Sequence, residues 1–330
     1  MSDLASDYRA LTDGIGWADF GARSQIEMIG EDRAKFLHNL CTNNIKDLPV
    51  GRGCEAFLLN AQGKILGHVL VFCGPESLVL ETVPGQGERL TQHLDRYLIR
   101  EKVELHDRSR ERSEVLLSGI DTEKWLARQG AIVPPSERLA HCATTLFNVP
   151  VSLRRVDFAG LQAFLIACER PNIEKLAADL RAEGVHECAP AAVEALRIEA
   201  GFPHFGTDIT DKNLPQEVAR DKAAISFTKG CYIGQETVAR IDALGHVNRL
   251  LCGVRFDGGE VPGVGTELFA AGQSPVQAAA QSVGHMTSAT FSPKLQSPLA
   301  LAYLRRGHHE PGTKLTTSQA AAEVIGLPVH

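Results

Sequence analysis

Strand-like and helix-like segments are mixed along most of the chain without strict alternation. Strand runs at 54–60, 64–72 and 77–83 follow one another before an amphipathic helix at 87–100, whereas a doubly wound parallel sheet would place a helix after each strand. From Cys252 onward there are short strand runs, many glycines and prolines and no convincing helix, which is typical of a small β-barrel. The pattern predicts an α+β module over 1–245 and a C-terminal β-barrel over 246–330.

The remaining predicted elements follow from periodicity and from helix start and stop signals. They are strands at 26–29 and 115–117, helices at 31–40, 122–129 and 172–183, a helix opened by Pro190, and a hairpin of strands 151–156 and 161–167 around a turn at 158–160.

Composition and charge exclude several classes of protein. The net charge of −6 and the pI near 6.1 argue against direct, nonspecific nucleic-acid binding, which needs a basic surface. No apolar stretch reaches the roughly 18 residues that span a membrane, and the acidic N-terminus does not resemble a signal peptide. The eight cysteines are scattered without the spacing of a zinc or cluster site. We therefore expect reduced, mostly buried cysteines, no metal site and a cytoplasmic location.

Residues 226–240 contain the most distinctive local pattern. Cys231 lies between Gly230 and Gly234 and directly follows the pair Lys229-Gly230, and a helical pattern starts at Gln235. A lysine and a helix N-terminus both favour a thiolate, so Cys231 is a candidate reactive thiol and Lys229 its activating neighbour. The alternative is that Cys231 is a small buried hydrophobic residue in a tight turn.

A second candidate lies at the end of the helix opened by Pro190. Glu199 is two residues before Gly201, where a carboxylate can face a cavity and accept hydrogen bonds from a planar pair of donors such as an amino-pyrimidine edge. The alternative is a surface glutamate or an ion pair with Arg197.

Several blocks resemble the folate-binding T-protein of the glycine cleavage system. In the N-terminal half they are Gly30-x-Asp-Arg-x-x-Phe-Leu-His-Asn-Leu40 and Asn60-Ala-Gln-Gly-Lys-Ile65, and in the middle Arg197-Ile-Glu-Ala-Gly, Phe205-Gly and Pro215-x-Glu217. Val283-Gly-His-Met-Thr-Ser288 and Leu299-Ala-Leu-Ala-Tyr303 resemble its C-terminal barrel. Lys229-Gly-Cys-Tyr-Ile-Gly-Gln-Glu236 is similar to the signature of a related family, YgfZ.

The resemblance implies a three-lobed, ring-like arrangement around a tetrahydrofolate pocket, with a ferredoxin-like lobe, a C-terminal β-barrel and lobes that interleave along residues 1–245. By motif match Glu199 would hold the pterin edge, and Phe205 stands where T-proteins usually carry a tyrosine. Cys231 would be the YgfZ cysteine. Cofactor contacts are also expected from three further residues of the same segment, Tyr232, Gln235 and Arg240.

One departure from the T-protein pattern bears on activity. T-proteins carry a catalytic aspartate in the hairpin segment Gly-x-x-x-Asp-Asp, and this chain has Gly67-His68 there instead. Aminomethyl transfer by the T-protein mechanism is therefore not expected. His68 could act as a base near neutral pH, although a histidine on a strand is more often structural. An arginine that T-proteins carry shortly before the cysteine motif is also missing.

The resemblance leaves three functions open. The first is a tetrahydrofolate-binding accessory protein for iron–sulfur cluster assembly or repair, serving clients such as tRNA-modifying enzymes through Cys231. The second is a folate-dependent one-carbon transferase or demethylase with a rebuilt active site that uses Cys231 or His68. The third is a scaffold in which Cys231 is inert.

Overall fold

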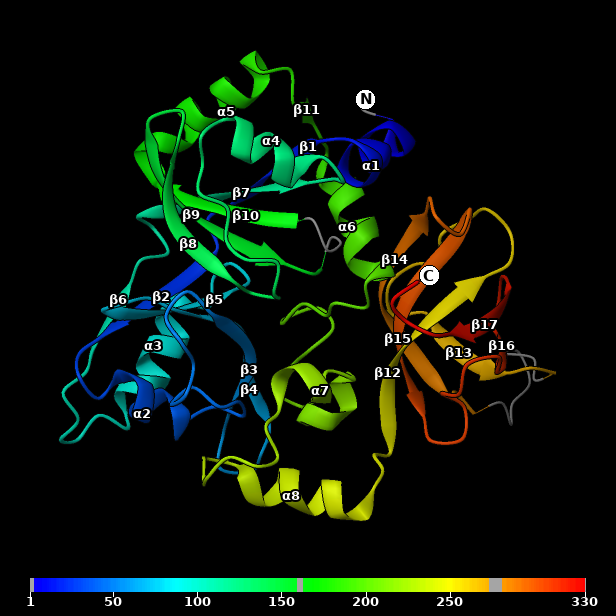
Figure 1. The fold of residues 1–330 in the computed structure, drawn as a ribbon. Helices are drawn as coiled ribbons and strands as arrows, with labels where there is room; N and C mark the ends of the chain where they lie inside the picture. Colours follow the sequence, from blue (N-terminus) through cyan, green and yellow to red (C-terminus); the bar gives the residue numbers. More distant parts are fainter. Residues whose placement is uncertain (1–2, 159–162, 273–280, 330) are drawn as a thin grey trace.

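A computed structural model describes residues 3–158, 163–272 and 281–329. Two lobes of mixed helix and strand and a separate barrel surround a central region where the chain crosses between them (Figure 1). The predicted α+β class with a C-terminal β-barrel is confirmed. Among the described residues, no helix is long and apolar enough to cross a membrane.

The first lobe is a five-stranded antiparallel sheet in the order β3-β4-β5-β2-β6. Apolar side chains of its strands and of its helices α2 and α3 form one core, which includes Leu37, Leu58 and Leu90. The elements are β2 (Ser24–Ile29), α2 (Arg33–His38), β3 (Gly53–Leu59), β4 (Ile65–Cys73), β5 (Ser77–Thr82), α3 (Gly87–Asp95) and β6 (Glu104–Asp107).

The second lobe is a six-stranded sheet in the order β11-β1-β7-β10-β9-β8. Within it β7, α4, β9, β10, α5 and β11 follow the ferredoxin-like order, and β1 is inserted between β11 and β7. The elements are α1 (Leu4–Asp13), β1 (Gly16–Gly21), β7 (Arg112–Ser118), α4 (Thr122–Arg128), β8 (His141–Leu146), β9 (Val149–Val156), β10 (Ala163–Glu169), η1 (Arg170–Asn172), α5 (Ile173–Ala182), β11 (His186–Glu187) and α6 (Pro190–Glu199).

Alternating side chains of the second sheet pack against helices on its two faces. Val115 and Leu117 of β7 lie in a core with α4 and α5, whereas Leu116 between them lies in a core with α1 and α6. Because β1 belongs to this sheet while β2 belongs to the first lobe, the two lobes interleave along the chain. On the face of Leu116, α6 leads from the second lobe toward the centre of the molecule (Figure 1).

The C-terminal strands close into a barrel in the order β12-β15-β14-β13-β16-β17. Its bounds are β12 (Arg249–Phe256), β13 (Glu267–Ala270), β14 (Gly284–Ser292), β15 (Ser297–Arg305), β16 (Lys314–Thr316) and β17 (Ala321–Ile325). Between α6 and the barrel the chain forms η2 (Pro215–Val218), α7 (Asp221–Ala224) and α8 (Gln235–Leu244). The helix α8 lies at the bottom of the view in Figure 1.

Some local predictions differ from the structure. The helix predicted at 87–100 ends at Asp95, because the amides of Tyr97 and Leu98 bond to the carbonyls three residues earlier and tighten the chain into turns. The helix α1 and strand β1 were not predicted. The turn predicted at 158–160 and the start of the strand at 161–167 fall on residues 159–162, which lie outside the described residues.

Candidate functional site

A cavity of about 400 Å³ lies where α1, α6 and the barrel meet. Glu199, the last residue of α6, lines it and is 5% exposed. The described residues that line this cavity are Tyr8, Thr12, Asp157, Leu196, Glu199, Ala200, Phe202, Arg220, Lys294, Pro328 and Val329.

The Glu199 carboxylate is held by neighbours from two other elements. The Tyr8 hydroxyl of α1 donates to Oε2 at 2.6 Å, and the Ser292 hydroxyl and the Lys294 amide of the barrel donate to Oε1. Burial and the hydrogen bond to Glu199 raise the pKa of Tyr8 well above its usual range, so its hydroxyl stays protonated and keeps donating. Glu199 is therefore a fixed acceptor at the wall of the cavity.

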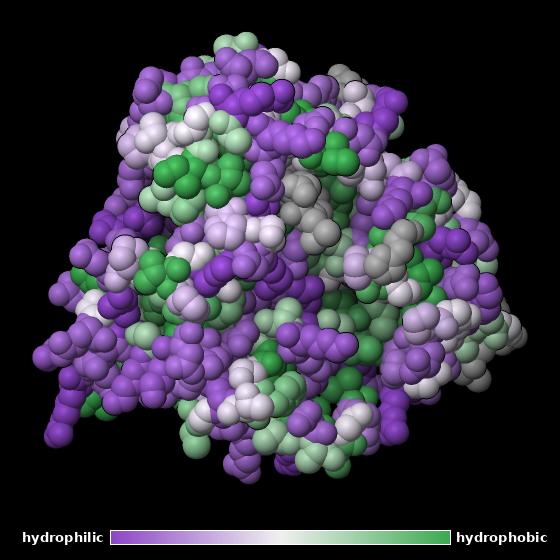
Figure 2. Space-filling view, viewed as in Figure 1, coloured by the Kyte–Doolittle hydropathy of each residue, from purple (hydrophilic) through white to green (hydrophobic). Residues whose placement is uncertain are grey.

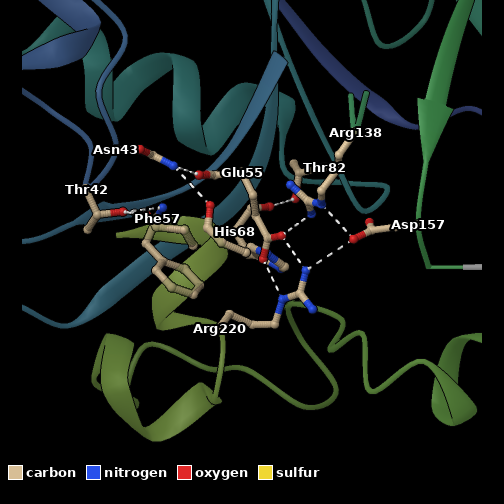
Figure 3. Close-up of polar contacts among 11 residues, drawn as sticks. Thr42, Asn43, Glu55, Phe57, His68, Thr82, Arg138, Asp157 and Arg220 are labelled. Carbon is tan, nitrogen blue, oxygen red and sulfur yellow. Dashed lines mark hydrogen bonds and ion pairs between the residues drawn. The ribbon is translucent and has the colours of Figure 1, made fainter. Parts of the chain in front are cut away.

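A buried ionic network lies next to this cavity (Figure 3). The fully buried Glu55 of β3 accepts hydrogen bonds from Nε and Nη2 of Arg220 and from Nη2 of Arg138. It also accepts one from His68 Nε2 at 2.8 Å. Arg138 also donates to Asp157 at 2.6 Å. Since Asp157 and Arg220 line the cavity, the network fixes part of its wall.

The charge of Glu55 is stabilised by these partners. Burial alone would raise the pKa of Glu55, but the hydrogen bonds from Arg220 and His68 and the charges on both hold it well below its usual range. Glu55 is a buried carboxylate that neutralises cations from distant parts of the chain.

His68, where the T-protein sequence pattern has an aspartate, is buried in this network. Its ring lies between those of Phe57 and Phe202, with centroid distances of 5.1 and 5.2 Å, and its Nε2 is bound to Glu55. This packing assigns it a structural role in the network, the more common of the two roles weighed from the sequence.

Phe202 and Phe205 lie in different surroundings. Phe202 lines the Glu199 cavity, and its ring centroid lies 5.2 Å from Cζ of Arg220. Phe205 is not among the described residues that line this cavity, and its ring instead lies 5.0 Å from the Arg89 guanidinium. The structure therefore presents Phe202, which the sequence analysis did not single out, as the aromatic wall of the cavity.

The segment with Cys231 is tied to the first lobe. Lys229 Nζ donates to the carbonyls of His38, the last residue of α2, and of Cys41 and Asn43 just beyond it. It also lies 4.8 Å from the Tyr232 ring centroid. Burial lowers the pKa of Lys229. The ammonium is thus engaged by backbone oxygens and anchors the loop on which Cys231 is exposed.

The rest of the motif shapes the same loop. Gly234 has a φ of +80°, and a Cβ there would lie 2.6 Å from the Asn60 carbonyl of the β3–β4 hairpin, so the close approach requires glycine. The Gln235 side chain accepts from the Tyr232 amide at 3.2 Å at the start of α8, and Arg240 is exposed further along that helix. Cys231, Tyr232, Gln235 and Arg240 are absent from the described residues that line the Glu199 cavity, so the structure divides the predicted site residues into two groups.

Replacing Lys229 by methionine is expected to release this loop. The substitution keeps the aliphatic stem but leaves three carbonyls without their donor, a cost of about 1–3 kcal/mol for the lost buried partner. Hydrogen exchange should accelerate at the amides of Ser226 and Ile233, which bond to Thr42 and Asn39 of the first lobe. The exposed Lys222→Met variant is the control, and unchanged exchange at both amides in Lys229→Met would contradict the anchoring role.

Comparison with known proteins gives matches over nearly the whole chain. Residues 2–229 match the family model of the GCVT N-terminal domain, and residues 249–329 match that of the glycine cleavage T-protein C-terminal barrel domain. An aminomethyltransferase of Symbiobacterium thermophilum is 27% identical over 329 residues, covering 95% of this chain and 84% of the relative. A putative chloroplastic transferase of Arabidopsis thaliana is 23% identical over 324 residues, covering 96% and 71%.

A solved structure has the same fold. The crystal structure of glycine cleavage system aminomethyltransferase T from Bartonella henselae matches with a TM-score of 0.86 at 21% identity, covering 99% of this chain and 89% of that one.

Proposed function

The chain belongs to the glycine cleavage T-protein family, and on that premise we propose that it is a tetrahydrofolate-binding accessory protein of the YgfZ type. In this proposal the protein supports the assembly or repair of iron–sulfur clusters in client enzymes, including tRNA-modifying ones, with Cys231 as its working thiol. It acts in the cytoplasm on proteins, without direct contact to nucleic acid.

The observation that supports folate binding most strongly is the buried Glu199 carboxylate on the cavity wall. Its oxygens can accept hydrogen bonds only, which suits the amino and ring N–H donors of a pterin. The cavity, about 400 Å³, falls in the roughly 300–1,000 Å³ range of small-molecule sites. Phe202 offers an apolar surface for a ring, and Arg220 and Lys294 offer positive charge to the glutamate tail of a folate.

Gly67 and His68, which stand where the T-protein pattern has its aspartates, favour the accessory role over T-protein chemistry. Gly67 has no side chain, and His68 is buried against Glu55, so neither supplies a carboxylate to the folate cavity. An aminomethyl transfer that depends on a carboxylate at this position would therefore lack it.

The surroundings of Cys231 suit contact with another protein. The thiol is exposed on an anchored loop, and Phe227, four residues earlier, is 49% exposed. Leu244 at the end of α8 is 60% exposed as well, and hydrophobic side chains are interspersed with hydrophilic ones over this part of the surface (Figure 2). An exposed thiol four residues from the exposed Phe227 can meet a client protein without entering the folate cavity.

The alternative is a folate-dependent one-carbon transferase or demethylase. The observation that favours it is Asp157, whose carboxylate lines the same cavity as Glu199 and could replace the missing aspartate as a proton acceptor. The relatives named aminomethyltransferases point to the same class of reaction. Release of formaldehyde or use of an aminomethyl donor, abolished in Asp157→Asn, would establish this alternative.

Folate binding is tested by thermal unfolding with and without tetrahydrofolate. A ligand at about 100 times its dissociation constant stabilises the native state by about 2.7 kcal/mol, so the wild type should melt at a higher temperature with folate. The Glu199→Gln variant should lose this shift, because the amide presents a donor where the pterin needs an acceptor.

The control variant is Glu194→Gln on the same helix, which does not line the cavity and should keep the full shift. No shift in the wild type at any soluble concentration of tetrahydrofolate would refute folate binding. A shift of the wild-type size in Glu199→Gln would refute the assigned pterin contact.

A further inference from the structure

Three side chains of the types that bind metal ions meet at the start of α6. Asp7 of α1, His186 of β11 and Cys188 each offer a ligand atom, and these atoms all lie within 4.8 Å of one another. Asp7 lies 179 positions before His186 in the sequence. Sequence spacing alone could not reveal this group.

The three side chains are already held in place. The Asp7 Oδ1 lies 2.8 Å from His186 Nε2, and its other oxygen accepts from the Ala189 amide at 2.9 Å. The Cys188 amide donates to the Trp17 carbonyl at 2.8 Å, which fixes the backbone next to the thiol. A Cβ at Gly16 would lie 2.8 Å from Cys188 Sγ, so the glycine makes room for the sulfur.

The group combines a buried interior with one open side. Asp7 and Cys188 are 1% and 5% exposed, whereas the His186 side chain is 45% exposed. Among the described residues, the acceptors of the Cys188 Sγ are the backbone carbonyls of Asp7 and His186, each at 3.6 Å, which are weak contacts for a thiol. Exchanging its proton for a metal bond therefore gives up little hydrogen bonding.

We propose that Asp7, His186 and Cys188 form a binding site for a first-row divalent metal ion, best matched by Zn²⁺. One oxygen, one imidazole nitrogen and one thiolate are all ligands that Zn²⁺ accepts, at about 2.0–2.3 Å. The three ligand atoms already lie within 4.8 Å of one another, and the exposed His186 gives the group access to solvent. Binding releases one proton for each ion, from the Cys188 thiol. The ion replaces the proton that His186 Nε2 donates to Asp7, and the neutral imidazole then carries its proton on Nδ1.

The position of the site gives the ion a structural consequence. Asp7 is followed by Tyr8, whose hydroxyl binds Glu199 at the opposite end of α6, about 15 Å away for a helix of this length. A bound ion joins α1 to the segment that leads into α6. It thereby holds in place the helix that supplies Tyr8 and Thr12 to the Glu199 cavity.

The test uses the full-length protein without an affinity tag, because a histidine tag would itself bind zinc. Metal-free protein is titrated with Zn²⁺ against a chromophoric chelator, and separately with Co²⁺. We expect one tight equivalent of Zn²⁺ per chain and, with Co²⁺, the near-ultraviolet charge-transfer absorption of a cobalt–thiolate bond. Zinc should also raise the melting temperature of the wild type.

Two ligand variants and a matched control interpret the result. Cys188→Ser and His186→Gln should each weaken Zn²⁺ binding by about a hundredfold or more, since even outer-shell changes cost about 10–100-fold. Cys188→Ser should also abolish the charge-transfer absorption, whereas Cys168→Ser, at a thiol that is equally buried in β10, should change neither. Binding of wild-type strength in both ligand variants, or no tight equivalent in the wild type, would overturn the proposal. Because His186 is exposed, its variant remains informative if Cys188→Ser fails to fold.

Discussion

Replacing Glu55 by glutamine is expected to lower the free energy of unfolding by about 3–5 kcal/mol. The glutamine has nearly the same shape, but it leaves Asp157 as the carboxylate that Arg138 and Arg220 must share, and the side chains of these arginines are only 32% and 16% exposed. Removing one partner of a buried ion pair is costly because the other charge stays desolvated. Urea unfolding of the wild type and Glu55→Gln measures this difference.

A surface pair gives the matched control for this variant. Glu137 binds Arg52 at 2.7 Å in a more exposed pair, so Glu137→Gln should cost no more than about 0–1 kcal/mol. A similar loss in both variants would show that Glu55 has no special role. The pKa of Glu55 is depressed in the folded state, so the stability that this carboxylate contributes is present above the ordinary carboxyl pKa. This contribution is lost as the pH falls through the folded pKa. Glu55→Gln should therefore lack this part of the wild type's loss of stability in acid.

The class of fold was predictable because it depends on local patterns. Alternating and helical periodicity marks β3, β4 and β5 and the helix α6, and the glycine- and proline-rich C-terminal part indicates a barrel. The place of each strand in its sheet depends on pairing between distant segments. The insertion of β1 between β11 and β7 joins residues 16–21 to 112–118 and to 186–187, and no local pattern encodes that.

The residues of the candidate site could likewise be predicted only in part from the sequence. Glu199 could be identified because it ends a helix just before a glycine and matches a family motif, and the structure places it on a cavity. The partners of Glu55 could not, because Arg138 and Arg220 lie 83 and 165 positions away. A usable signal was nevertheless present, since Glu55 is a single charged residue in the otherwise apolar run 54–59, and a buried carboxylate needs cationic partners.

A second buried network, between the two α+β lobes, predicts an equally large effect. Arg154 Nη1 lies 2.7 Å from Glu81 and 2.8 Å from Glu114, and both carboxylates are fully buried. Arg154→Met introduces an apolar side chain of similar length and leaves Glu81 and Glu114 without the guanidinium that binds both. Among the described residues, the cation that remains in contact is Arg23, 3.5 Å from Glu81. We expect a loss of about 3–5 kcal/mol in the free energy of unfolding, measured with urea near pH 8.

The pH dependence distinguishes this network from simple packing. Burial and the charge of Glu81 raise the pKa of Glu114 to about 8. A carboxyl whose pKa is higher in the folded state stabilises the protein below its unfolded pKa, and this contribution is lost as the pH rises through about 8. The cost of Arg154→Met should therefore be smaller near pH 5, where Glu114 can hold a proton, and adding Glu114→Gln should remove much of the pH dependence. An equal loss at both pH values would mean that Arg154 acts through packing on Phe72, whose ring centroid lies 4.9 Å from its guanidinium, and not through charge.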